Sequence, residues 1–166
     1  MEEHMSLEAP TARPLFVNEH AGRAVAGMVA LLAGSILAFD LPWLLALLAY
    51  EFGARVLAGH RFSAMALLAT RVIVPALGLA PRWTPAPPKR FAQAIGLLVS
   101  SAALVTWPLL GLDGVGRVLL ALLLVFAFLE AALGFCAGCY LFGRLMALGL
   151  IPARVCEVCR ADGVRS

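Results

Sequence analysis

The four cysteines of this chain form two Cys-x-x-Cys pairs. Cys136 and Cys139 follow a long apolar run, Cys156 and Cys159 lie in a charged tail, and the 166 residues contain no other cysteine. Two thiols three residues apart can form a reversible disulfide or occupy two positions of a metal site. The sequence therefore predicts thiol or metal chemistry in this part of the chain, with Cys136 and Cys139 as the candidate catalytic pair.

The reactivity of Cys136 depends on where the helix before it ends. A thiolate is stabilised at the N-terminus of a helix and disfavoured at the C-terminus. If the chain breaks at Gly134 and a new helix starts at Cys136, then Cys136 is a nucleophile and Cys139 its resolving thiol. If the helix continues unbroken, the pair is a poor nucleophile. In a third alternative, the two cysteines only pack beside Phe135 and Tyr140.

Glu130 is a candidate partner of this pair, because a carboxyl group inside an apolar run is usually paired, protonated or functional. It lies about 9 Å from Cys136 along a straight helix axis, at a rise of 1.5 Å per residue. A general-base role for Glu130 therefore requires the chain to bend at Gly134. The alternative is a buried ion pair with Arg55 or Arg71.

The spacing of the two cysteine pairs also fits a metal site. Sixteen residues separate Cys139 from Cys156, so the chain reads C-x2-C-x16-C-x2-C, within the spacing of tetrahedral zinc sites. The ligands would be Cys136, Cys139, Cys156 and Cys159. Residues 140–150 look helical, however, and lack the strand and turn pattern of a zinc ribbon. We therefore expect no bound cofactor and keep zinc as the alternative.

The composition predicts the environment of these residues. With 62% apolar and 14% charged residues and a mean hydropathy of +0.92, the chain is far more apolar than a soluble domain. It is predicted to be an integral membrane protein with the lipid bilayer as its main partner. The first 23 residues contain several charges and no apolar core, so no cleavable signal is expected. No basic patch or phosphate-binding motif indicates nucleic acid.

Four apolar runs are long enough to cross a bilayer, which takes roughly 20 helical residues. The predicted spans are about 19–39, 42–59, 91–110 and 115–135. Asn18 is the expected N-cap of the first span and Asp40 that of the second. The predicted fold class is an all-α integral membrane protein with four transmembrane helices.

A fifth apolar run, residues 62–80, contains Arg71 and Pro75. With four spans, twelve of the thirteen Lys and Arg residues fall on one side and only Arg117 on the other. Because basic residues mark the cytoplasmic side, residues 62–80 are predicted to be a cytoplasmic interfacial or re-entrant helix, and both termini to be cytoplasmic. The predicted domains are a disordered arm (1–17), a membrane domain (18–150) and a Cys-x-x-Cys tail (151–166).

Two sequence elements carry a resemblance to a known family. Pro87–Gly96 reads PPKRFAQAIG and Leu129–Cys139 reads LEAALGFCAGC. Together they resemble a family of small bacterial membrane proteins catalogued as domain of unknown function 4395, over about residues 18–150. The resemblance implies a multi-helix protein of the inner (plasma) membrane linked to thiol or sulfur chemistry. Of the four cysteines, Cys136 and Cys139 match the family pattern.

The expected function is thiol–disulfide or sulfur-transfer chemistry at Cys136 and Cys139 on the cytoplasmic side. A soluble thiol or sulfurtransferase partner would exchange electrons or sulfur with this pair. One alternative is a non-catalytic membrane scaffold whose four cysteines bind zinc. Another is a small transporter that uses Glu51 and Glu130 in its path, although Glu51 and Arg55 are also spaced as a structural i, i+4 pair.

Overall fold

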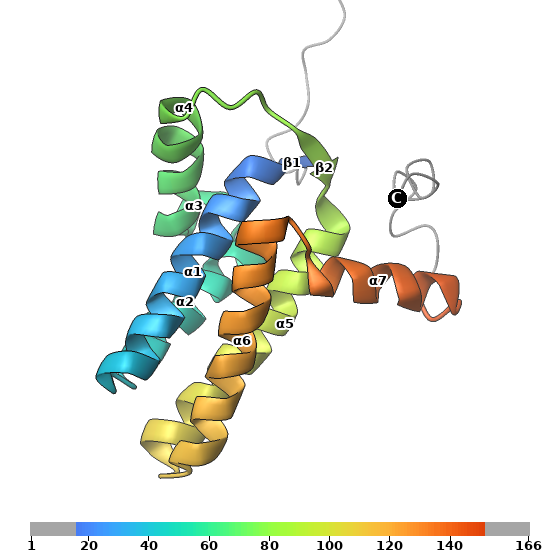
Figure 1. The fold of residues 1–166 in the computed structure, drawn as a ribbon. Coiled ribbons are helices and arrows are strands. Elements are labelled where there is room, and N and C mark those ends of the chain that lie inside the picture. Colours follow the sequence, from blue (N-terminus) through green and yellow to red (C-terminus); the bar gives the residue numbers. More distant parts are fainter. Residues whose placement is uncertain (1–15, 152–166) are drawn as a thin grey trace, which may run out of the picture.

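The computed structural model describes residues 16–151, which fold into a helical bundle with one small antiparallel sheet (Figure 1). Strand β1 (Phe16–Asn18) pairs with strand β2 (Trp83–Pro85). Each strand leads directly into a long helix, so the sheet fixes the starts of these two helices at the same end of the bundle. The Asn18 side chain accepts a hydrogen bond from the His20 N–H, as predicted for the N-cap.

Within residues 16–151, three helices are long and apolar enough to cross a membrane. They are α1 (Glu19–Phe39), α5 (Ala86–Leu104) with its π-helical extension η3 (Val105–Leu109), and α6 (Asp113–Leu133). These helices agree closely with the predicted first, third and fourth spans. Helix α1 packs chiefly against α6.

The second predicted span, 42–59, is shorter than expected. Helix α2 (Leu44–Leu57) has 14 residues and is about 21 Å long, too short to cross roughly 30 Å of hydrocarbon alone. Asp40 is not its N-cap, because Asp40 instead ends α1 in the left-handed region, with φ 53°. Its carboxylate accepts a hydrogen bond of 2.8 Å from Arg117, so the turn after α1 is held to the start of α6.

The segment after α2 forms a second short helix. Helix α3 (Ala64–Leu68) continues through the π-helical turn η2 (Ala69–Ile73) into α4 (Val74–Ala76), after the single turn η1 (His60–Phe62). It lies alongside α1 (Figure 1). Residues 62–80, predicted as an interfacial or re-entrant helix, are thus helical from Ala64 to Ala76, and their position relative to the membrane stays a prediction.

A buried polar cluster forms the break between α2 and α3. The Glu51 carboxylate accepts hydrogen bonds from the Ser63 hydroxyl and from the Ala64 N–H at 3.1 Å, and Arg55 lies 3.5 Å from it. Glu51, Arg55 and Ser63 are all nearly inaccessible to solvent. Because free N–H groups at a helix start attract a carboxylate, Glu51 fixes the start of α3. The predicted i, i+4 pair of Glu51 and Arg55 is confirmed.

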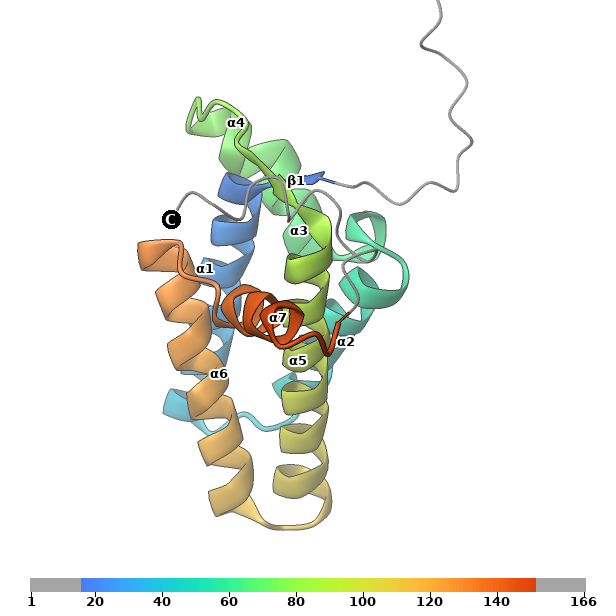
Figure 2. The same ribbon diagram turned by 90° about the vertical axis from the view of Figure 1, so that its right-hand side faces the viewer.

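The chain bends sharply between α6 and the last helix, α7 (Ala137–Ala147). Gly134 has φ 72° and its N–H donates to the Glu130 carbonyl, ending α6. Glycine adopts this left-handed conformation without strain. After two more residues α7 begins, and it crosses α5 and points away from the bundle (Figures 1 and 2). Figure 2 views α7 nearly end-on.

Candidate functional site

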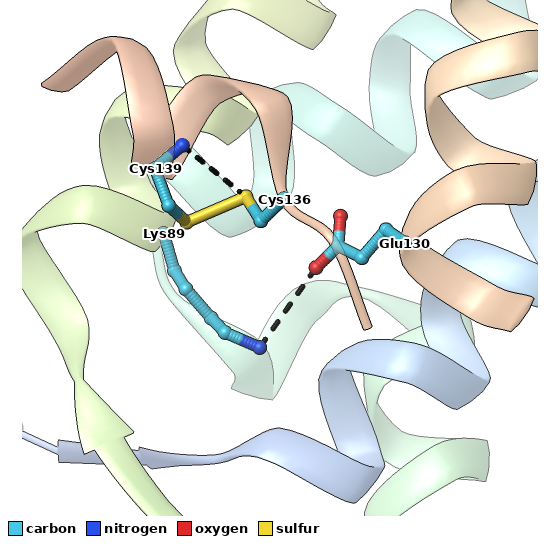
Figure 3. Close-up of a disulfide and its surroundings, with 4 residues drawn as sticks. All are labelled: Lys89, Glu130, Cys136 and Cys139. Carbon is cyan, nitrogen blue, oxygen red and sulfur yellow. Dashed lines mark hydrogen bonds and ion pairs between the residues drawn. A yellow bond between two sulfur atoms is a disulfide. The ribbon is translucent and has the colours of Figure 1, made fainter. Parts of the chain in front are cut away.

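Cys136 and Cys139 are joined by a disulfide at the start of α7, with their Cα atoms 5.2 Å apart (Figure 3). Cys136 is the N-cap of α7, and its sulfur accepts a hydrogen bond of 3.3 Å from the Cys139 N–H. This is the first of the alternatives from sequence: the break occurs at Gly134 and the new helix starts at Cys136. A negative charge on the Cys136 sulfur would therefore face the free N–H groups of a helix start.

Gly138, between the two cysteines, brings α7 against α5. A Cβ atom at Gly138 would lie 2.5 Å from the Ala92 Cβ and 2.6 Å from its Cα, so any larger residue would force the helices apart. Further along α7, the rings of Phe142 and Phe91 pack with centroids 5.5 Å apart. The two sequence elements that carried the family resemblance, Pro87–Gly96 and Leu129–Cys139, thus meet at the disulfide.

Glu130 forms an ion pair with Lys89 of α5, with Nζ and Oε1 3.8 Å apart. The predicted partners Arg55 and Arg71 were wrong, because Arg55 pairs with Glu51 and Arg71 is exposed. Figure 3 shows the Lys89 side chain starting near the disulfide and extending away from the sulfurs, so that its ammonium meets the Glu130 carboxylate.

Lys89 was therefore missed as a site residue. Lys89 lies one turn before Ala92 on α5. Its ammonium group lies against Gly22 of α1, where the Cβ atom of any other residue would collide with it. The signal that could have identified Lys89 was its place in the element Pro87–Gly96, on which the family resemblance rests, directly before Arg90 and Phe91.

Arg23 of α1 holds the end of α6 at the site. Its guanidinium donates hydrogen bonds to the carbonyls of Ala131, at 3.2 Å, and Ala132, at 2.8 Å. The last carbonyls of a helix lack partners within it, and a cation there also complements the helix dipole. Arg23 thus gives two of the last carbonyls of α6 a partner and ties α1 to the end of α6 at the site.

The disulfide borders a cavity of about 360 Å³ at the end of the bundle, which we call the outer cavity. Both cysteines, Lys89 and Glu130 line it, together with Glu19, Arg23, Thr84, Phe135 and Tyr140. A reactant entering this cavity would meet the two sulfurs and the Lys89–Glu130 ion pair together.

A second cavity, of about 310 Å³, lies between the helices, and we call it the inner cavity. Cys136, Lys89 and Glu130 line this cavity as well, so they form the boundary between the two spaces. Its walls are mainly apolar, and the polar groups include Arg55, Thr70 and Gln93. The disulfide is therefore accessible from the end of the bundle through one cavity and from its interior through the other.

Within residues 16–151, no three His, Cys, Asp or Glu side chains gather in a way that could hold a metal ion. Cys156 and Cys159, the other two ligands of the predicted zinc site, lie outside the described residues. The four-cysteine zinc site therefore stays a prediction.

Comparison with known proteins gives one match. Neither the curated proteins nor the solved structures contain a match to the chain. The model of the family described as "Domain of unknown function (DUF4395)" matches residues 17–147, which include α1, the cavity-lining parts of α5 and α6, and the whole of α7. The chain belongs to this family.

Proposed function

We propose that this protein is a membrane thiol–disulfide exchange protein whose reacting pair is Cys136 and Cys139. The observation that carries the proposal is the disulfide at the N-cap of α7, bordering an open cavity with the Lys89–Glu130 ion pair. A sulfur at a helix N-terminus next to a cation is a good nucleophile and a good leaving group.

In the proposed reaction, a thiolate of a dithiol partner attacks the Cys136 sulfur. The bond between Cys136 and Cys139 breaks, and its electron pair leaves on Cys139, which takes up a proton. The second partner thiolate then attacks the partner's own sulfur in the mixed disulfide. Cys136 leaves as a thiolate, so that two electrons have passed from the partner to the protein and the partner holds a new disulfide. The reverse sequence oxidises the protein.

Lys89 and Glu130 have separate roles in this reaction. The Lys89 ammonium favours the negative charge that forms on Cys136 when it leaves. Glu130, near the end of α6, lines the same cavity as both cysteines and is the candidate to transfer the proton of Cys139. The bend at Gly134 is what brings Glu130 and Cys136 to the same cavity.

For the membrane arrangement, we propose four crossings with both termini in the cytoplasm. Helices α1, α5 with η3, and α6 are the three continuous crossings, while α2 and α3–α4 together make a discontinuous second one. A broken helix is tolerated in a membrane where the freed backbone groups have partners inside the protein, and Glu51 and Ser63 supply them here. The reacting pair then faces a soluble cytoplasmic thiol partner from the inner membrane.

Trapping of a mixed disulfide tests the proposed reaction. Cys139→Ser protein, in detergent, should form a stable covalent complex with a thioredoxin-type protein whose resolving cysteine is replaced by serine and whose other cysteine carries a small thiol in a mixed disulfide. Cys136 displaces the small thiol, and neither protein then keeps a thiol at the reacting site that can resolve the new disulfide. The matched variant Cys136→Ser should form much less complex. Equal trapping by both variants, or a bound zinc ion and no reactive thiols in the purified wild-type protein, would contradict the proposal.

A further inference from the structure

The inner cavity contains a buried guanidinium with unsatisfied hydrogen-bond donors. Arg55 is 2% exposed, and its Nε and Nη2 atoms have no hydrogen-bond partner in the structure. Leaving such donors unpaired in a protein interior costs about 1–3 kcal/mol each, and more for a charged group. An occupant of the cavity that accepts these hydrogen bonds would remove this cost.

The charge of Arg55 is already balanced, which limits what this occupant can be. Glu51 lies 3.5 Å from Arg55, and the Lys89 ammonium that lines the same cavity is paired with Glu130. What Arg55 lacks is an acceptor atom rather than a counter-charge. A neutral carbonyl oxygen fits this need better than a carboxylate or a phosphate does.

The shape and lining of the cavity indicate an apolar ligand that arrives from the lipid. Its volume of about 310 Å³ lies at the small end of the roughly 300–1,000 Å³ of small-molecule sites. Three of its wall residues, Leu122, Phe126 and Leu141, are nearly half exposed on the outside of the bundle. These residues lie on α6 and α7, so the cavity opens sideways and a lipid-soluble molecule can enter between these two helices.

Cys136 lines the same cavity, so a ligand bound there would lie beside the reacting disulfide. We propose, on the basis of the exchange function above, that the inner cavity binds a quinone, with a ring carbonyl on Arg55 and the ring near Cys136. A quinone is apolar like the cavity wall, carries carbonyl oxygens that can accept hydrogen bonds from Arg55, and takes up the two electrons that the reduced cysteine pair can give.

The electrons balance in the corresponding reaction. The Cys136 thiolate adds to a ring carbon, and the Cys139 thiolate then attacks the Cys136 sulfur. A sulfur–sulfur bond forms as the carbon–sulfur bond breaks, and the electron pair passes to the ring. The two ring oxygens take up the two protons that the thiols release. The products are the disulfide and a hydroquinone.

Quinone binding can be measured without any thiol chemistry. In the Cys136→Ser/Cys139→Ser protein in detergent, titration with menadione or with a decyl-substituted benzoquinone should quench tryptophan fluorescence with saturation. Arg55→Lys keeps the charge but loses the unpaired guanidinium donors, so it should weaken binding roughly tenfold, as expected for the loss of one good hydrogen bond. This readout remains valid even where the exchange reaction itself fails.

A second pair of variants tests the cavity without changing Arg55, in case the Arg55 variant does not fold. Leu122→Phe narrows the side opening of the cavity without adding a tryptophan and should also weaken quinone binding. Val118→Phe is one turn away on α6, at a residue that is 60% exposed and outside the cavity, so it should bind quinone as the unmodified protein does. Equal quinone affinity in all these proteins overturns the proposal. Displacement of the quinone by oleate with higher affinity also overturns it, because the site would then take an anionic lipid.

Discussion

Gly138 of α7 lies directly against the backbone of Ala92 of α5, and this contact places the disulfide beside Lys89. Ala92 and Lys89 are three residues apart and so lie on the same face of α5, while Gly138 lies between Cys136 and Cys139. The helix start that activates one sulfur is therefore positioned by a glycine in the Cys-x-x-Cys motif itself. The motif encodes helix packing as well as sulfur chemistry.

Enlarging Gly138 should damage the site in a way that an equal change elsewhere on α7 does not. Gly138→Ala introduces a methyl group where Ala92 leaves no space, and overpacking of this kind costs about 1–3 kcal/mol. Gly143→Ala meets no atom within 4 Å and should stabilise α7 by up to about 1 kcal/mol. Thermal unfolding in detergent measures both, and similar shifts in the two variants would show that the α5–α7 contact is unimportant.

In the reduced protein, Cys136 should be alkylated before Cys139. Its sulfur caps α7 and faces free N–H groups, so its alkylation rate should rise with pH around a midpoint below about 8.5, the ordinary pKa of a thiol. Mass spectrometry after short iodoacetamide pulses identifies the modified residue. The Cys156→Ser/Cys159→Ser background removes the other pair from the measurement. Equally slow alkylation of Cys136 and Cys139 would leave only the packing or metal alternatives.

Replacing either member of the Lys89–Glu130 pair should change this reactivity in opposite directions. Lys89→Met removes the cation that favours the Cys136 thiolate and should slow its alkylation at pH 7 by up to about tenfold, equivalent to one pKa unit. Glu130→Gln removes the opposing charge and should accelerate alkylation. Arg82→Met is a control, since Arg82 is highly exposed and pairs with Glu19 instead. Slower alkylation in Glu130→Gln would indicate that Glu130 accepts the thiol proton.

Arg23 should contribute to stability by holding the end of α6 to α1. Arg23→Gln removes hydrogen bonds to two carbonyls at the end of α6, and each hydrogen bond to a charged group contributes about 1.5–3 kcal/mol. We expect a lower unfolding temperature and faster reduction of the disulfide by dithiothreitol, because the bend at Gly134 loosens. Arg144→Gln, which loses a hydrogen bond and a cation–π contact to Tyr140 on the exposed face of α7, should change neither measurement.

The proposed topology can be tested with single cysteines in a background that lacks the four native ones. A cysteine at Arg82, next to β2, should react with a membrane-impermeant maleimide only after the cells are opened. A cysteine at Asp113, at the start of α6 and the opposite end of the bundle (Figure 1), should react in intact spheroplasts. The reverse pattern would invert the orientation, and labelling of both positions from one side would exclude four crossings.

Local patterns in the sequence predicted the local structure well. The Asn18 cap, the bounds of α1 and α6, and the alternative of a break at Gly134 follow from side-chain hydrogen bonding, apolar run length and the conformational freedom of glycine. Each of these depends on residues a few positions apart, so it can be recognised without knowing the fold. Asp40 was assigned to the wrong helix because a short polar residue in a tight turn is compatible with ending one helix as well as starting the next.

Contacts between distant segments were decided by the packing of whole helices. Lys89 reaches Glu130 because the β1–β2 pairing sets the starts of α1 and α5 side by side and Gly22 leaves room for its ammonium. Arg55 was expected to pair with Glu130 because of their opposite charges. It pairs instead with Glu51, one turn away on α2. Each charged residue in a sequence has many possible partners of opposite charge. Only the tertiary arrangement determines which two come within a few ångströms of each other.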